Sequence, residues 1–226
     1  MTTLVLAAHP DDEVLGCAGT IARLARAGEA VHICILGEGA TARYDTRGSA
    51  GTAEVDALAA TSREVAELLG AKEVRLLGLP DNRLDTVPLL EVVQHVEAVI
   101  DELQPEVVYT QHGGDLNIDH VTLYRATLTA TRPVPGHPVR AVYAYEVASS
   151  TEWSFARFEP AFRPTTFVEI GATLEVKLRA MEMYEAEVRP FPHPRSPEAL
   201  RARAHHWGSA VGVEAAEAFE LVRELR

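Results

Sequence analysis

Two short segments of the sequence combine imidazole and carboxylate side chains at a spacing that suits metal binding. The first is His-Pro-Asp-Asp-Glu at residues 9–13, and the second runs from Gln111 to the pair Asp119-His120. Histidine nitrogens and carboxylate oxygens are ligands for zinc and other divalent metals. Carboxylates also cap helix N-termini, so the acidic residues alone are compatible with capping. Capping does not explain the imidazole of His9.

The elements around these segments alternate along the chain. Short apolar runs predict buried strands, and apolar residues at helical spacing predict helices between them. We expect strands at 3–8, 31–36, 73–77, 106–110, 139–146 and 166–170, and helices at 13–27, 52–69, 88–103 and from about 120. This alternation indicates an α/β fold of βαβ units, with helices on both faces of a mostly parallel sheet. After residue 170 we expect a mainly helical segment, packed on the same single domain of residues 1–226.

The predicted sheet brings the two segments together. In doubly wound sheets the first and fourth strands are commonly neighbours, and functional groups gather beyond the carboxyl ends of the strands. His9 and His120 should therefore converge with a carboxylate from Asp11 or Asp12. Three N and O ligands leave a position open for water, as in catalytic zinc sites. The aspartate that does not bind the metal can take a proton from the attacking water, which predicts metal-assisted hydrolysis of an amide or ester.

Both segments also resemble the motifs of the PIG-L/LmbE family of zinc-dependent N-deacetylases. Residues 8–13 reproduce the family's A-H-P-D-D-E segment, and Asp119-His120 matches the end of its second motif. A loose K-x-x-A pattern of the family is matched by Lys177 and Ala180, with Tyr184 in the same predicted helix. The resemblance covers most of the chain, and it implies a Rossmann-like three-layer α/β/α sandwich.

The resemblance implies a role for each residue of the first segment. The family's zinc ligands fall on His9, Asp12 and His120, and its general base falls on Asp11. The implied substrate is a small-molecule N-acylated sugar or glycoconjugate that loses an acyl group, usually acetyl. Zinc is the implied cofactor, although N and O ligands also accept Fe²⁺, Co²⁺ or Mn²⁺. Family members are often homo-oligomers, so a homo-oligomer is one expectation. An amidase acting on a larger conjugate and a non-catalytic metal- or sugar-binding domain are the alternatives.

The second motif departs from the family pattern. Many members have Tyr-Gly-His-Pro-Asp-His, where this chain has Asp-Leu-Asn-Ile-Asp-His at 115–120. Asn117 stands in place of a histidine that helps to stabilise the oxyanion, and it can donate a hydrogen bond but no proton. The leaving amine would receive its proton from Asp11, or from His193 if the proline-rich segment 189–197 folds back over the site. The alternative for His193 is an ordinary loop residue.

Two arginines and two glycines complete the candidates. Arg43 and Arg83 lie in loops that should follow the second and third strands, where they could bind a sugar hydroxyl or an anionic group. Solvated loop arginines are the alternative. Gly16 and Gly19 belong to no G-x-G-x-x-G fingerprint after the first strand, so we do not expect a dinucleotide. Close packing of a helix on the sheet explains these glycines better.

The composition is ordinary for a globular enzyme that acts on a small molecule, with 47% hydrophobic and 24% charged residues. The formal net charge of −12 argues against nucleic acid as a partner, because a polyanion binds to a basic face. The apolar stretches are strand-length, which predicts no membrane span, and the N-terminus lacks a basic leader. Cys17 and Cys34 lie in apolar surroundings, so we expect buried, reduced thiols and a cytoplasmic protein.

Overall fold

The computed structural model describes residues 1–41 and 52–226, and a seven-stranded sheet forms its centre. The strand order is β3-β2-β1-β4-β5-β7-β6. The strands are β1 (Thr2–Ala7), β2 (Ala30–Gly37), β3 (Glu73–Leu79), β4 (Val107–Gln111), β5 (Ala141–Tyr145), β6 (Thr166–Glu169) and β7 (Ala216–Glu224). Strands β1 to β5 are parallel, and β7 pairs antiparallel with both β5 and β6. The mostly parallel sheet is thus confirmed, and β1 and β4 are neighbours as expected.

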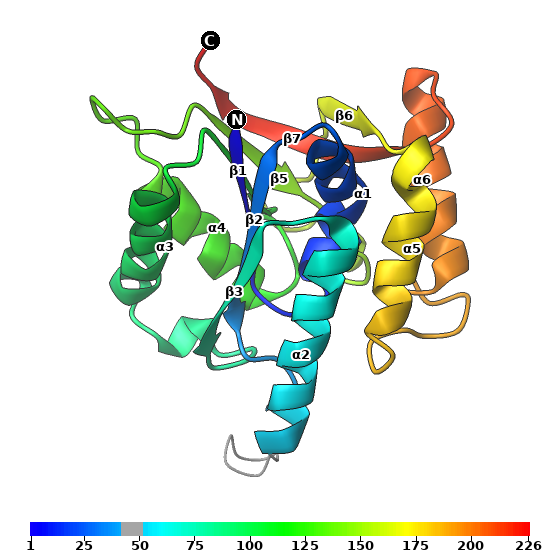
Figure 1. The fold of residues 1–226 in the computed structure, drawn as a ribbon, viewed down its shortest axis with the longest axis horizontal. Helices are drawn as coiled ribbons and strands as arrows, with labels where there is room; N and C mark the ends of the chain where they lie inside the picture. Colours follow the sequence, from blue (N-terminus) through cyan, green and yellow to red (C-terminus); the bar gives the residue numbers. More distant parts are fainter. Residues whose placement is uncertain (42–51) are drawn as a thin grey trace.

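Helices cover both faces of this sheet. They are α1 (Asp12–Arg26), α2 (Thr52–Leu69), α3 (Leu89–Leu103), α4 (Ile118–Ala130), α5 (Leu174–Met183) and α6 (Pro197–Val211), with short 3-10 turns η3 (Leu84–Thr86), η4 (Glu152–Ser154) and η5 (Gly171–Thr173). Figure 1 shows α3 and α4 on one face, and α1, α2, α5 and α6 on the other. This arrangement confirms the three-layer α/β/α fold.

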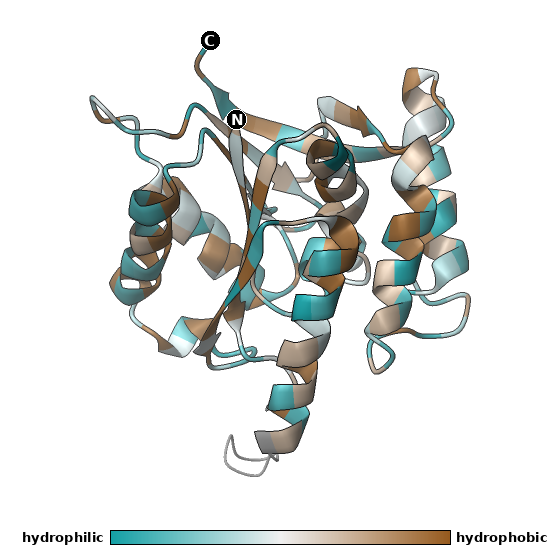
Figure 2. Cartoon of the chain, viewed as in Figure 1, coloured by the Kyte–Doolittle hydropathy of each residue, from teal (hydrophilic) through white to brown (hydrophobic). Residues whose placement is uncertain are grey.

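The strand periodicity builds one apolar core on each face. Successive side chains of a strand point to opposite faces, so Leu4 and Leu6 of β1 pack with α3 and α4, while Val5 and Ala7 pack with α1 and α2. All four side chains are buried. Figure 2 shows the apolar character of the strands and the polar residues on the helices. The buried sheet therefore fixes the strand ends that carry the polar segments.

The two glycines of α1 allow this helix to lie close to its neighbours. A Cβ atom at Gly16 would lie 2.1 Å from the Tyr145 ring, and one at Gly19 would lie 2.8 Å from Ile170. Neither distance is compatible with a side chain. Close packing is thus confirmed as the reason for both glycines.

The C-terminal part of the chain differs from the expectation of a mainly helical segment. After α5 and α6 it ends in strand β7, which lies between β5 and β6. The β7 sequence, AEAFELVRE, is rich in good helix formers, so propensity alone does not indicate a strand. Pairing with two neighbours overrides that preference.

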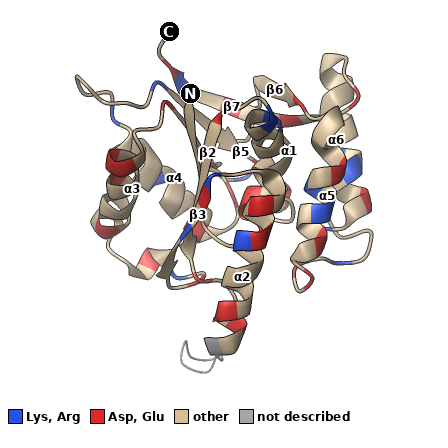
Figure 3. Ribbon diagram, in the orientation of Figure 1, with Lys and Arg blue, Asp and Glu red and all other residues tan. Residues whose placement is uncertain are grey.

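Charged side chains lie mainly on the outer helices. Figure 3 shows acidic residues along α2 and α3 and basic residues on α5 and α6. Among the described residues, no helix is long and apolar enough to cross a membrane. Cys17 and Cys34 are both buried free thiols, as expected.

Candidate active site

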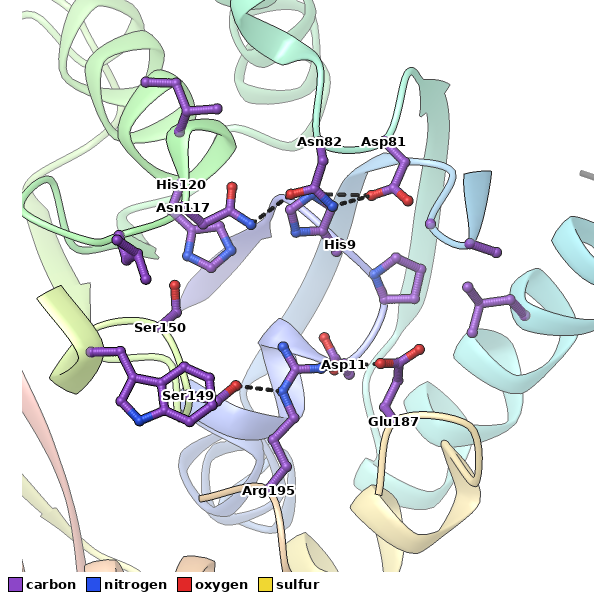
Figure 4. Close-up of a pocket in the computed structure, with 17 residues that line it drawn as sticks. His9, Asp11, Asp81, Asn82, Asn117, His120, Ser149, Ser150, Glu187 and Arg195 are labelled. Atoms are coloured by element: carbon purple, nitrogen blue, oxygen red, sulfur yellow. Dashed lines mark hydrogen bonds and ion pairs between the residues drawn. The ribbon is translucent and has the colours of Figure 1, made fainter. Parts of the chain in front are cut away.

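Three potential metal ligands meet where β1 and β4 end. His9 follows β1, Asp12 is the first residue of α1, and His120 lies in the first turn of α4. Asp12 Oδ2 lies 3.2 Å from His9 Nδ1 and 3.3 Å from His120 Nε2. One ligand atom from each residue lies within 4.8 Å of the others. The structure therefore brings together the three residues that the sequence singled out, and both imidazoles line one cavity (Figure 4).

A second carboxylate lies against the far nitrogen of each imidazole. His9 Nε2 is 3.1 Å from Asp119 Oδ2, and His120 Nδ1 is 3.2 Å from Asp115 Oδ1. Such pairing fixes the tautomer and orientation of a metal-binding histidine. The orientation of Asp119 agrees with one of the two roles considered for it. Capping of α4 falls instead to Asn117, whose side chain accepts from the Asp119 N–H.

Electrostatics in this cluster favour a cation. Burial alone would lower the pKa of His9, yet hydrogen bonds with Asp119 and Asp12 hold that pKa well above its usual value. Burial also opposes the charge of His120, but Asp12 and Asp115 raise its pKa to about 9. The pKa of Asp12 is held well below its usual range because the two histidines outweigh its burial. Without a metal, protonated imidazoles thus supply the positive charge.

The donor set fits a divalent metal ion. Both ring nitrogens of His120 are buried, and neither makes a well-aligned hydrogen bond within the described chain. Asp12 Oδ2 is oriented by the His9 N–H at 2.8 Å and by Gln111 Nε2 at 2.7 Å. Two imidazole nitrogens and one carboxylate oxygen are the ligands of a catalytic zinc site with an open position.

Asp11 faces the same cavity by a different route. Its φ of 107° lies in the left-handed region, which is strained for a residue with a Cβ and is found at functional sites. The turn separates its side chain from that of Asp12, and its N–H donates to Glu13 Oε2 at 3.1 Å. Asp11 is 2% exposed. Burial raises the pKa of Asp11, Arg195 opposes that rise, and Asp12 adds to it.

The cavity in front of these residues has a volume of about 530 Å³. Its walls come from loops that follow four strands and from the turn before α6. Besides His9, Asp11 and His120, the lining comprises Pro10, Gly39, Ala40, Leu58, Asp81, Asn82, Leu116, Asn117, Ile118, Ser149, Ser150, Trp153, Glu187 and Arg195. Such a mixed polar and apolar cavity can accommodate a small molecule.

The other candidates from the sequence have different fates. Asn117 lines the cavity, and its Nδ2 donates to Asn82 Oδ1 at 2.8 Å. His193 is not among the lining residues; it packs against Trp153 with ring centroids 5.4 Å apart. Arg83 is exposed before η3 and is also not among them. Arg43 lies outside the described residues.

The segment 189–197 does return to the site, but it brings an arginine. Arg195 Nη1 lies 2.8 Å from Asp11 Oδ2. The His193 Nδ1 atom accepts from the Arg195 N–H at 3.1 Å, and burial with Arg195 nearby lowers the pKa of His193. The sequence reasoning chose the titratable residue of this segment and missed its neighbour. The acidic pair at 11–12 was the signal that could have suggested a basic partner.

Known proteins resemble the chain in sequence and in fold. The family model PIG-L, described as GlcNAc-PI de-N-acetylase, matches residues 4–131. A 1D-myo-inositol 2-acetamido-2-deoxy-alpha-D-glucopyranoside deacetylase from Streptomyces avermitilis is 30% identical over 212 residues, which are 76% of this chain and 71% of the relative. Diacetylchitobiose deacetylase from Thermococcus kodakarensis is 26% identical over 238 residues, which are 97% and 82% of the two chains. The conserved protein TT1542 from Thermus thermophilus superposes with a TM-score of 0.77 at 29% identity, covering 99% and 96%.

Proposed function

Because the chain belongs to the PIG-L family, we propose that it is a zinc-dependent hydrolase that removes an N-acyl group from an amino sugar or sugar conjugate. Acetyl is the acyl group we propose, since the two named relatives are deacetylases of amino-sugar compounds. The observation that carries the proposal is the convergence of three N and O ligands with a fourth, unligated carboxylate in one cavity.

His9, Asp12 and His120 are the residues that would hold the zinc ion. When bound, zinc supplies a Lewis acid that polarises the amide carbonyl and lowers the pKa of water. Asp119 and Asp115 keep the two imidazoles oriented for this purpose.

Asp11 is the general base in this proposal. It accepts a proton from the water molecule whose oxygen attacks the amide carbon. The carbon–nitrogen bond then breaks, and Asp11 returns the proton to the leaving nitrogen, so that the products are a carboxylic acid and a free amine. The position of His193 outside the cavity lining favours this single-residue route over a separate donor. Asn117 can offer its amide N–H to the oxyanion if it exchanges its contact with Asn82.

The test is release of free amine from a panel of N-acetylated sugars, glycoconjugates and sugar nucleotides. We expect turnover that depends on about one zinc ion per chain and is lost with a chelator. Asp11→Asn should retain the zinc and lose turnover by at least about 10³-fold. Turnover that persists without metal would contradict the proposal. A biological effect that survives Asp11→Asn would identify a binding domain instead.

A further inference from the structure

We propose that Arg195 is a positioning residue, which holds the carboxylate of Asp11 in place for proton transfer. Glu187 and Ser149 in turn fix the guanidinium of Arg195. This inference rests on the proposed function, because it assigns a task to Arg195 in that reaction.

The contacts of Arg195 define its guanidinium on two sides. Its Nη1 atom donates to Asp11 Oδ2 at 2.8 Å and to Glu187 Oε2 at 3.1 Å, and its Nε atom donates to Ser149 Oγ at 2.8 Å. Figure 4 shows the guanidinium between Asp11, Glu187 and Ser149. Charge-assisted hydrogen bonds to a planar guanidinium set direction as well as distance. The guanidinium therefore has one orientation, and Asp11 shares it.

Each of the three supporting residues comes from a different part of the fold. Glu187 follows α5, Ser149 lies in the loop after β5, and Arg195 directly precedes Ser196, the N-cap of α6. Ser196 is fully buried, and its hydroxyl accepts from the Ala199 N–H at 3.0 Å. The backbone at Arg195 is thus fixed by the helix that it precedes.

Asp11 needs such a partner because its surroundings are acidic. Asp12, Glu13 and Glu187 surround it, and all of them disfavour a second carboxylate in that place. Among the described residues of the cavity lining, Arg195 is the only lysine or arginine. Its contact uses Oδ2 of Asp11, which leaves Oδ1 to face the reacting water. The arginine thus offsets the repulsion and selects the oxygen that receives the proton.

Recognition of an anionic substrate is a weaker explanation for this arginine. Its Nη1 already lies between two carboxylates, Asp11 and Glu187, so a substrate anion would compete with both. A positioning role affects the chemical step, whereas an anion-binding role affects substrate affinity. The two roles therefore differ in which kinetic constant they change.

The experiment measures kcat and KM for zinc-loaded wild type, Arg195→Ala and Arg195→Lys on the best substrate of the amine-release panel. We expect kcat of Arg195→Ala to fall about 100-fold, because a misplacement of about 1 Å costs that much. KM should stay within about twofold. Added guanidinium ion should restore part of the kcat of Arg195→Ala, and Arg195→Lys should keep an intermediate kcat because lysine lacks the planar fork. Glu187→Gln should lower kcat less than Arg195→Ala.

Two controls separate this inference from the proposed function and from misfolding. Arg201→Ala removes an exposed arginine that pairs with Glu175 on the surface, and it should leave kcat unchanged. If wild type is inactive on every substrate, the proposed function fails; if wild type is active and Asp11→Asn is not, only the Arg195 inference is at stake. An unchanged kcat in Arg195→Ala, or a higher KM at normal kcat, overturns it. A crystal structure of Arg195→Ala with Asp11 unmoved would also overturn it.

Discussion

At the scale of single residues, the carboxylates behind the two imidazoles matter as much as the ligands themselves. Asp119 is fully buried, and its two oxygens serve two donors: His9 Nε2 at 3.1 Å and the Leu84 N–H at 2.9 Å. Asp115 is held by Ser150 and Thr151 as well as by the Asn117 N–H. These contacts place both carboxylates before any metal binds.

We expect Asp119→Asn to weaken zinc binding by about 10–100-fold. Asparagine has one acceptor oxygen, so it can serve either His9 or the Leu84 N–H but not both. Competition with a chromophoric chelator measures the affinity. Asp85→Asn changes an exposed aspartate in the neighbouring η3 turn and is the matched control. Equal affinity in wild type and Asp119→Asn would show that the contact does not support the ligand.

The raised pKa values of His9 and His120 predict how zinc affinity changes with pH. Both imidazoles are protonated at pH 7 without metal, since the pKa of His120 is about 9 and that of His9 is well above its usual value. Zinc must displace these protons, so its affinity should rise from pH 6 to 9, with about two protons released per ion at pH 7. Calorimetry in buffers of different ionisation enthalpy counts the protons. A flat pH profile would contradict the raised pKa values.

The metal-free protein should show the opposite trend. A group whose pKa is raised by folding stabilises the fold fully below its unfolded pKa and loses that contribution as pH rises through the folded pKa. For His120 this window runs from 6.5 to about 9. Urea unfolding of the metal-free protein across this range should therefore show falling stability, which His120→Asn should reduce.

The sequence located the residues near strand ends far better than the residue that comes from a distant loop. His9 and His120 follow strands whose apolar pattern is plain, and the sheet topology brings them together. Arg195 is 184 positions from Asp11 and lies in a proline-rich turn without periodicity. Its approach depends on how α5 and α6 pack, and no local pattern encodes that packing.

At the scale of elements, a buried ion pair joins β7 to α1 and α5. Lys177 Nζ on α5 lies 2.5 Å from Glu217 Oε1 on β7 and donates to the Leu15 carbonyl at 2.9 Å. Glu217 also accepts from the N–H groups of Gly19 and Thr20 in α1. Both charged side chains are at most 6% exposed. The pair thus fastens the last strand to the helix that begins in the active site.

We expect Glu217→Gln to reduce the free energy of unfolding by about 3–5 kcal/mol, because it leaves the Lys177 ammonium buried without its counter-charge. Urea denaturation measures the loss. Adding Lys177→Met should recover part of it, because the unpaired charge is then gone. Glu97→Gln breaks an exposed pair with Arg132 and should change stability little. A loss no larger than that of Glu97→Gln would show that the buried pair is dispensable.

The same strand marks the limit of prediction from sequence at this scale. The five parallel strands were predictable because each is a short apolar run followed by a helix. β7 contains a buried glutamate where an inward position normally carries an apolar residue. Only the presence of Lys177 on another element makes that glutamate acceptable, and the pairing is set by the whole fold.

At the scale of the whole molecule, the metal should stabilise the protein, because its ligands lie on β1–α1 and on α4. A zinc ion that bridges these parts binds only the folded chain. At a free concentration 100 times the Kd it should add about 2.7 kcal/mol of stability. Thermal unfolding with and without chelator measures the shift in Tm. His120→Asn should abolish this shift, and an equal shift in that variant would place the metal elsewhere.

The position of β7 also bears on how the chain folds while it is being made. The ribosome delivers β1 to β5, and with them every proposed metal ligand, well before β7. Until β7 emerges, β5 is an open sheet edge, and an open edge can pair with other chains. A nascent chain that has emerged only to Gly212 would therefore have its zinc ligands in place, yet it would be prone to aggregation and would need a chaperone. Insertion of β7 closes that interval and docks α6, with Arg195 at its start, onto the finished sheet.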